Sequence, residues 1–409
     1  NKSLQGALPE NYFSRMQIPA NKMSSLIDVV NDIESVHNYH EDLIGRIYEY
    51  FLSNFALAEG KGKGEFYTPK SIVDLIAELI QPFQGKIYDP CCGSGGMFVQ
   101  SIKFVENHKG SKKNISIYGQ EQTTTTYKLA KMNLAIRGLS ANLGQVATDT
   151  LHDDQHKDEK FDFIMANPPF NQKDWRSEKE LTNDPRWSAY AIPPKSNANY
   201  AWILHMVSKL SQNGVAGFIL SNGALSATGV ELEIRKKLIE NDLVEAIIVL
   251  PMDMFYTTDI SVSLWIVSRN KKERVVIDED STNTLRDRSN EVLFIDARNC
   301  GEIYQKKFIQ IVEKDIELIS NIYSNWKYKH LYTNYQDIDE LCYSANIDEI
   351  QKKNFSLVPS NYIKFNERDI FNDIEDNLDS YKKNILSSLE NDIKINQNLI
   401  NTILGESNK

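Results

Sequence analysis

The sequence lacks the features that mark several common protein classes. It has four cysteines in 409 residues, at positions 91, 92, 300 and 342, without a CxxC pair or a His-rich spacing beside them. We therefore expect no metal site and no disulfide framework, and a reducing cytoplasm is the expected location. No apolar run approaches the roughly 18 residues of a membrane helix, so no membrane partner is expected.

An excess of basic residues is also missing. There are 46 Lys and Arg against 56 Asp and Glu, a formal net charge of -10 and a pI near 5.4. Affinity for duplex DNA rests largely on basic side chains that neutralise phosphates. We therefore expect this chain to bind DNA weakly on its own. The acidity is uneven, because residues 334–409 hold 8 basic and 14 acidic residues and so carry -6. We expect that tail to face protein, not phosphate.

What is present is the composition of an ordinary globular protein, 41% hydrophobic and 25% charged. Apolar residues recur at helical spacing over 24–57, and three alternating glycines within 59–64 mark a hinge. Thr68 is expected to cap a helix that runs to about Gln81, with Pro69 in its first turn.

Short apolar runs then alternate with helical patterns, which predicts a doubly wound, mostly parallel α/β sheet with helices on both faces. The predicted strands are 86–89, 115–118, 161–166, 214–221, 243–250, 260–268 and 292–296; the predicted helices are 95–107, 122–138, 199–211, 230–240 and 303–323. The strands over 243–250 and 260–268 could form an antiparallel pair at one edge. Residues 271–291 look loop-like. The predicted domains are a helical N-terminal part (1–60), an α/β domain (61–330) and a C-terminal extension with an amphipathic helix (331–409).

Three constellations could carry chemistry. The first is the loop Asp89-Pro90-Cys91-Cys92-Gly93-Ser94-Gly95-Gly96 between a strand and a helix, where glycines allow close approach of a ligand to the backbone. The dinucleotide fingerprint GxGxxG is not met, because Phe98 stands where its third glycine is due. On its own, the loop is equally typical of a small-molecule cradle and of a tight turn.

The second constellation is Asn167-Pro168-Pro169-Phe170 at the end of a strand. Two prolines fix φ twice and would aim the Asn167 side chain and the Pro168 carbonyl off the carboxyl edge, where open α/β sheets bind ligands. A plain Pro-Pro turn is the alternative. The third is Glu121, which follows a strand at the position where a ribose diol is held; it could equally be a solvated acid at a helix N-terminus.

Taken in order, these motifs resemble S-adenosylmethionine-dependent amino-methyltransferases, and more closely the modification (M) subunit of type I restriction-modification systems. The matching segments are Phe66-Tyr67-Thr68-Pro69, Asp89 to Gly96, Gly119-Gln120-Glu121, Asp149-Thr150-Leu151, Ala166 to Phe170, Gly229-Val230-Glu231, Leu250 to Ile260 and Pro359 to Ile363. The resemblance covers about residues 60 to 360. It departs at Ser261 and Val262, where the family often has Pro and Thr.

The resemblance implies a class I S-adenosylmethionine-dependent methyltransferase fold and methylation of adenine at its exocyclic amine. Asn167, Pro168, Pro169 and Phe170 would be catalytic, with the Asn167 side chain and the Pro168 carbonyl accepting from the amine and Phe170 stacking on the base. Because the amine is inaccessible in a duplex, the adenine must be flipped out.

The resemblance also implies S-adenosylmethionine as cofactor. Its ammonium would lie near Asp89, its ribose near Glu121 and its adenine amine near Asp149, while Tyr67, Thr68 and Pro69 would close over the methionine end. The full set of implied cofactor-binding residues is Glu65, Phe66, Tyr67, Thr68, Pro69, Lys70, Asp89, Gly93, Ser94, Gly95, Gly96, Glu121 and Asp149.

The implied partners are double-stranded DNA and a specificity (S) subunit, with two M per S; whether a nuclease/translocase (R) subunit joins is left open. An apolar repeat near 3.5 residues from Phe371 to Ile403 predicts a tail helix that contacts another subunit. Methylation of RNA or of a protein glutamine, and a catalytically silent cofactor-binding scaffold, are the alternatives.

Two further features lie outside these motifs. The segment 171–198 carries Trp175 and Trp187 among basic residues, which suits nucleic-acid contact and, equally, a packed loop that covers the sheet edge. His205 lies on a predicted buried helix and is expected to be a core histidine, not a base.

Overall fold

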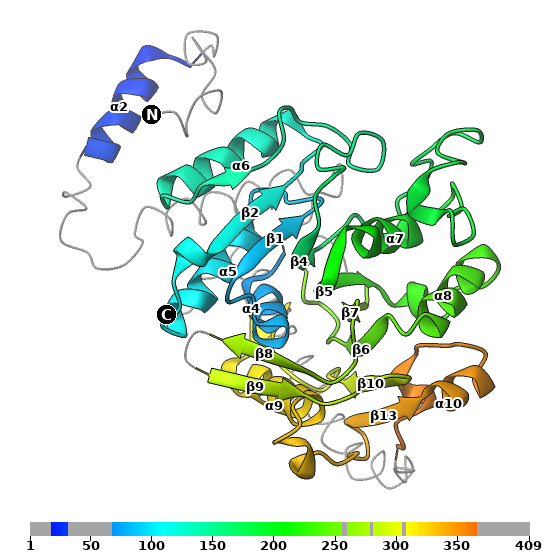
Figure 1. Ribbon diagram of the computed structural model, residues 1–409. Helices are drawn as coiled ribbons and strands as arrows, with labels where there is room; N and C mark the ends of the chain where they lie inside the picture. The colour runs from blue at the N-terminus through cyan, green and yellow to red at the C-terminus, as the bar shows by residue number, and fades with distance from the viewer. Residues whose placement is uncertain (1–17, 32–67, 256–259, 279–280, 305–307, 366–409) are drawn as a thin grey trace, which may run out of the picture. The chain divides into compact units, whose positions relative to one another are not determined.

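A computed structural model of the chain describes residues 18–31, 68–255, 260–278, 281–304 and 308–365 (Figure 1). The chain divides into two compact units, residues 1–363 and 364–409. Of the residues 24–57 that were predicted to be helical, the structure describes one helix, α2 (Ala20–Asn31). The predicted tail helix lies outside the described residues, and the domain limits at 60 and 330 stay predictions.

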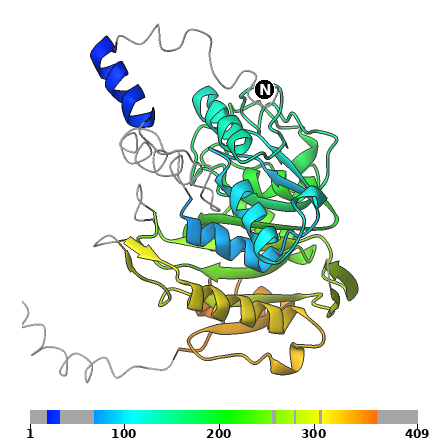
Figure 2. The same cartoon turned by 90° about the vertical axis from the view of Figure 1, so that its left-hand side faces the viewer.

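A nine-stranded sheet forms the centre of the first unit, in the order β13-β10-β6-β7-β5-β4-β1-β2-β3 (Figures 1 and 2). The strands from β5 through β4, β1 and β2 to β3 are parallel neighbours, and β6 is parallel to β10. β7 is antiparallel to both of its neighbours, and β13 is antiparallel to β10. The strand bounds are β1 (Gly85–Asp89), β2 (Ile115–Gly119), β3 (Ala141–Asn142), β4 (Phe161–Ala166), β5 (Leu210–Ser221), β6 (Val244–Val249), β7 (Val262–Ser268), β10 (Glu291–Asp296) and β13 (Cys342–Asn346).

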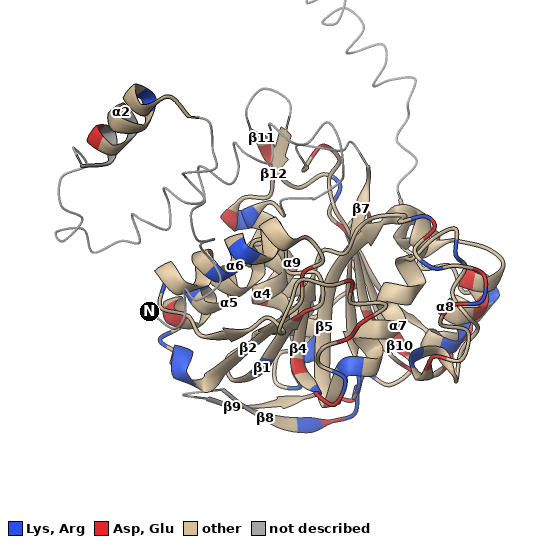
Figure 3. Ribbon diagram, turned by 90° about the horizontal axis from the view of Figure 1, so that it is seen from above, with Lys and Arg blue, Asp and Glu red and all other residues tan. Residues whose placement is uncertain are grey.

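Helices cover both faces of this sheet, which confirms the predicted doubly wound α/β architecture. The side chains of α7 and α8 pack into one apolar cluster, and those of α4 and α9 pack into another on the opposite face. Seen from above in Figure 3, α4, α5 and α9 lie to one side of the strands. The helix bounds are α4 (Lys70–Ile80), α5 (Gly96–Asn107), α6 (Thr124–Ile136), α7 (Asn199–Lys209), α8 (Val230–Glu240), α9 (Glu313–Lys327) and α10 (Ile347–Lys352).

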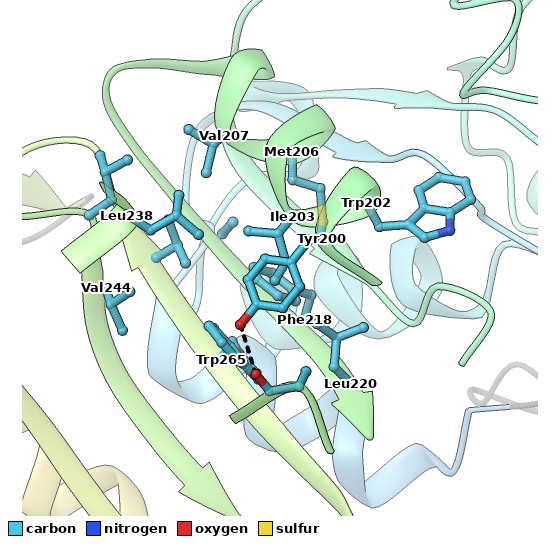
Figure 4. Packing of buried hydrophobic residues seen from close by; sticks show 14 of the residues in the cluster. Tyr200, Trp202, Ile203, Met206, Val207, Phe218, Leu220, Leu238, Val244 and Trp265 are labelled. Carbon is cyan, nitrogen blue, oxygen red and sulfur yellow. Dashed lines mark hydrogen bonds between the residues drawn. The ribbon is translucent and has the colours of Figure 1, made fainter. Parts of the chain in front are cut away.

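Strands that are buried on both faces explain how one sheet supports two cores. Side chains alternate across a strand, so Ile164 joins the α7 and α8 cluster, whereas its neighbour Met165 joins the α4 and α9 cluster. Figure 4 shows the first cluster from close by, with Ile203 and Met206 of α7 among the side chains that pack near Phe218 of β5. Burial on both faces holds the carboxyl edge of the parallel strands rigidly.

Three predictions about local structure were wrong. Residues 271–291 contain the antiparallel hairpin β8 (Arg274–Asp278) and β9 (Ser281–Leu285); β9 is almost entirely polar, so a hydrophobicity pattern does not reveal it. The helix predicted over 303–323 begins only at Glu313, after a second small hairpin of β11 (Glu302–Tyr304) and β12 (Phe308–Gln310). β6 and β7 do pair antiparallel, but inside the sheet and not at its edge.

The start of α4 also differs from expectation. Pro69 occupies the N-cap, and no side chain caps this helix, so Thr68 does not have the predicted capping role. Within the described part of the chain, no helix is long and apolar enough to cross a membrane. The same residues include no group of three or more His, Cys, Asp or Glu side chains that could hold a metal ion.

Candidate active site

The glycine loop joins the end of β1 to the start of α5 in a tight turn. Gly93 and Gly95 have φ of 53° and 82°, in the left-handed region that side chains with a Cβ rarely adopt. Gly95 is the N-cap of α5 and no side chain caps the helix, so its first-turn amides are left to other acceptors. The loop therefore brings bare backbone and a helix N-terminus to the carboxyl edge of the sheet.

Two buried carboxylates flank this loop. Asp89 ends β1, and its Oδ1 accepts from the Cys91 amide at 3.0 Å. Glu121 follows β2, and its Oε2 accepts from the Gly93 amide at 3.0 Å. Burial, together with a smaller effect of the nearby charge of Glu121, raises the pKa of Asp89 to about 7, although the hydrogen bonds with Cys91 act in the opposite direction. An acid held this way is stabilised in its charged form by a cationic ligand group.

Asn167 follows β4, the strand beside β1, and reaches the same edge. Its Nδ2 donates to Thr68 Oγ1 over 3.0 Å, although the two residues are 99 positions apart. Its Oδ1 is buried and has no hydrogen-bond partner among the described residues. Buried amide oxygens are almost always paired, so this oxygen points to a ligand that donates a hydrogen.

A pocket joins these elements. Of the predicted site residues, it brings together Thr68, Lys70, Asp89, Gly93, Ser94, Gly96 and Asn167. Its other lining residues are Val73, Cys91, Cys92, Met97, Gln100 and Asn133. The buried acid Asp89, the glycine turn and Asn167 thus line one cavity.

Comparisons with known proteins agree with this geometry. The sequence model of the N-6 DNA methylase family matches residues 39–370. The chain is 45% identical over 331 residues to the type I restriction enzyme HindI methylase subunit of Haemophilus influenzae, a match that covers 81% of this chain and 70% of that protein. It is 35% identical to the MjaIX methylase subunit of Methanocaldococcus jannaschii, over 98% of this chain and 70% of that protein.

The chain belongs to the N-6 DNA methylase family, among the type I methylase subunits. A solved structure agrees: the type I restriction-modification methyltransferase subunit from Streptococcus thermophilus superposes with a TM-score of 0.68 at 28% identity, over 82% of this chain and 66% of that one. The chain is thus an adenine-specific DNA methyltransferase with the class I fold, and family and fold together imply S-adenosylmethionine as methyl donor.

Not all predicted site residues meet at the methyltransferase pocket. Glu65, Phe66 and Tyr67 lie outside the described residues. Asp149 is not part of the pocket lining; its Oδ1 accepts from the Leu151 amide at 2.8 Å and its Oδ2 lies 3.1 Å from His152 Nδ1. Glu121 accepts a hydrogen bond from the Gly93 amide, which lines the pocket. Gly95 is the N-cap of α5, the helix that begins at the pocket.

Two polar residues of the methyltransferase pocket escaped the sequence reasoning. Gln100 on α5 is 7% exposed and Asn133 on α6 is 2% exposed. Asn133 Nδ2 donates to the Ser94 carbonyl over 2.8 Å, and its Oδ1 accepts from Arg137, which ties α6 to the glycine loop. Each is a polar residue at a buried position of a helix, and that pattern could have marked both as candidate site residues.

The segment that follows Phe170 packs against the methyltransferase core. Trp175 and Trp187 are 4% and 1% exposed, and their rings meet edge to face at 5.9 Å. Of the two interpretations left open, the packed loop is correct for these tryptophans, which are too buried to stack on splayed bases. The Phe170 ring meets the buried Phe255 edge to face at 5.8 Å.

A cluster of amides fixes the backbone directly after Phe170. Asn171 has a φ of 52°, and its Oδ1 accepts from Asn199 Nδ2 at 2.9 Å, Ser221 Oγ at 3.0 Å and Asn197 Nδ2 at 3.3 Å. The Asn171 amide in turn donates to Asn199 Oδ1 over 3.0 Å. This cluster links the residue after Phe170 to α7 and β5. No sequence motif predicted it.

His205 is a core residue, as expected. It is fully buried, and burial together with the charge of Arg186 lowers its pKa to about 3. Its ring lies 3.2 Å from the Tyr88 hydroxyl and 3.1 Å from Arg186 Nη1. A neutral histidine enclosed by these groups has no access to a reacting substrate.

Proposed function

We propose that this chain methylates the exocyclic amine of an adenine flipped out of double-stranded DNA, with Asn167-Pro168-Pro169-Phe170 as the catalytic segment. The buried, unpaired Oδ1 of Asn167 carries the proposal. An exocyclic amine offers two hydrogens as donors, and an amide oxygen is a matching acceptor. Its place beside the glycine loop, in one pocket, puts the substrate amine next to the cofactor site.

The chain's own groups act on the amine by position and charge. Asn167 Oδ1 and the Pro168 carbonyl accept one hydrogen each and hold both out of the base plane, which leaves the nitrogen lone pair free to attack. Pro168 and Pro169 restrict the backbone that presents these acceptors. Phe170, whose ring is braced edge to face by Phe255, stacks on the base. Catalysis then rests on orientation more than on a strong base.

The pocket fits S-adenosylmethionine, which when bound supplies an electrophilic methyl group on a sulfonium. Asp89 is the buried acid for its ammonium, and burial without a cation leaves that acid with a raised pKa. The bare turn at Gly93 and Gly95 admits a ligand against the backbone. Glu121, whose carboxylate oxygens accept from the Gly93 and Thr123 amides beside the glycine loop, is proposed for the ribose hydroxyls. Asp149 is proposed for the cofactor's adenine amine.

We also propose assembly with a specificity (S) subunit, two methyltransferase chains to one S, and the names of the relatives support membership of a type I complex. These relatives are named as type I methylase subunits, and one solved relative of similar fold is described as part of type I complex assembly. The formal charge of -10 agrees, because such a chain needs a partner to hold the phosphates. Gel-shift binding should therefore be much tighter with S than without it, and equal binding at physiological salt would contradict this assembly.

The test of the catalytic proposal is Asn167→Ala in the complex with S. We expect calorimetric affinity for S-adenosylmethionine to stay within about twofold, while methyl transfer falls by about a thousandfold, as when a transition-state hydrogen-bonding group is removed. Asn107→Ala, an exposed asparagine on α5, is the matched control. Retained methylation in Asn167→Ala overturns the mechanism, and label that enters RNA or protein but not DNA overturns the substrate.

A further inference from the structure

The hydrogen bond between Thr68 and Asn167 has a role of its own. Asn167 Nδ2 donates to Thr68 Oγ1 over 3.0 Å, and both residues line the pocket. This contact occupies the amino end of the Asn167 side chain. The carbonyl end, Oδ1, is left buried and has no hydrogen-bond partner among the described residues, so its lone pairs remain for a donor.

We infer that Thr68 is a positioning residue for catalysis: its hydroxyl oxygen holds the Asn167 carboxamide with Oδ1 directed at the substrate amine. The inference rests on the proposed function, which makes Asn167 the acceptor of that amine. It gives Thr68 a role distinct from contact with the cofactor.

The need for such a group follows from the symmetry of a carboxamide. Its two ends have similar shapes, and the terminal torsion of an asparagine has broad, nearly two-fold preferences. If the amide turned over, its NH2 group would face the adenine NH2, donor against donor. The Thr68 hydroxyl holds one end of the carboxamide in place, and because a hydroxyl can accept or donate, it is the adenine NH2, which needs an acceptor, that selects the orientation with Oδ1 facing it.

Thr68 is well placed to be rigid. Pro69 follows it, restricts the backbone of the preceding residue and forms the N-cap of α4. Ile72, Leu75 and Ile76 of that helix are fully buried against the sheet. The hydroxyl is therefore carried by a helix locked into the core, and it meets the end of β4 from outside the strand.

The test compares Thr68→Val with Thr68→Ser in the full-length chain together with its S subunit. Valine keeps the shape and removes the acceptor, whereas serine keeps the acceptor. With labelled S-adenosylmethionine in single turnover, Thr68→Val should methylate DNA at least about tenfold more slowly, the factor for one oriented hydrogen bond. Its dissociation constant for S-adenosylmethionine should change by less than about twofold, and Thr68→Ser should restore the rate to within about twofold.

Two outcomes overturn the inference. A Thr68→Val complex as fast as wild type shows that the hydrogen bond is not needed. Weaker cofactor binding with an unchanged rate at saturating S-adenosylmethionine makes Thr68 a cofactor contact instead. Thr125→Val, at an exposed threonine on α6, controls for the substitution itself.

Additional comparisons cover a variant that does not fold and a wild-type complex that is inactive. If Thr68→Val does not fold, the near-isosteric pair Thr68→Ser and Thr68→Cys decides, because a thiol is a weak acceptor; equal rates in that pair refute the inference. An inactive wild-type complex refutes the proposed function instead, so the two failures are distinguishable.

Discussion

Asp89 should set both the stability of the cofactor-free protein and the pH dependence of cofactor use. Its side chain is 2% exposed, and burial raises its pKa from 3.8 to about 7. The Asp89→Asn substitution keeps the Oδ1 that accepts from the Cys91 amide but removes the charge. We expect the variant to be more stable than wild type and nearly unable to bind S-adenosylmethionine.

The magnitude follows from linkage. A folded pKa above the unfolded one means that the stability contributed by this group is full below about 3.8 and is lost as the pH rises through about 7. At about 1.4 kcal/mol for each pKa unit, ionising the buried carboxyl costs on the order of 4 kcal/mol above neutral pH. The advantage of asparagine over aspartate should grow by about 2 kcal/mol between about pH 5.5 and about pH 8.

Urea unfolding of both proteins without cofactor, at several pH values, measures this difference. Asp158→Asn, at an exposed aspartate, is the matched control and should leave the stability within about 0.5 kcal/mol at every pH. Parallel stability curves for wild type and Asp89→Asn would refute the assignment of the pH dependence to Asp89.

Cofactor use should respond to pH in the opposite sense. The ammonium of S-adenosylmethionine pairs with the carboxylate form, so kcat/KM for the cofactor should rise about tenfold per pH unit up to about pH 7 and then level off, since this ratio reports the free enzyme. The Asp89→Asn variant should show a low, flat profile. A wild-type profile that is flat over this range would remove Asp89 from the ammonium site.

Three further predictions test the surroundings of the site. Asn171→Ala should leave several donors unpaired, cost about 1 to 3 kcal/mol of stability and slow methylation more than it weakens cofactor binding. Asn171→Asp keeps the acceptor and is the control, so equal single-turnover rates in the two variants would contradict the prediction. Trp187→Ala should cost about 3 to 5 kcal/mol in urea unfolding and leave the salt dependence of DNA binding by the complex unchanged, because the ring is buried. Glu245→Gln should also cost about 3 to 5 kcal/mol of stability, because it leaves the charged Arg288 fully buried without its ion-pair partner. Burial alone would raise the pKa of Glu245, but the charges of Arg288 and Lys327 lower it to about 2. The stability contributed by this carboxylate is therefore present above about pH 4.5 and is lost as the pH falls toward 2.

Much of the site could be predicted because its signals are local. A glycine turn between a strand and a helix, and a strand that ends in Asn-Pro-Pro-Phe, are properties of a few consecutive residues. Parallel strands bring their carboxyl ends to one edge, so the order of the motifs along the chain was enough to place Asp89 and Asn167 near one pocket.

Other features depended on partners far away in the sequence. The insertion of β7 between β5 and β6 could not be inferred, because a strand that is buried along its whole length has the same pattern at any interior position of the sheet. The same holds for Trp187, whose pattern is common to a packed loop and to a nucleic-acid surface until its burial is known.

The amino-acid sequence by itself thus determined the fold class and the family and predicted which residues face the reaction, since these rest on periodicity, turn chemistry and motif order. Only the tertiary structure decided how those residues support one another. It paired Thr68 with Asn167 across 99 positions, joined Asn171 to Asn199 and Ser221, and buried Asp89 beside Glu121. Hydrogen bonds and desolvation act through space, so the orientation of an amide and the charge of an acid are set by neighbours that no local pattern names.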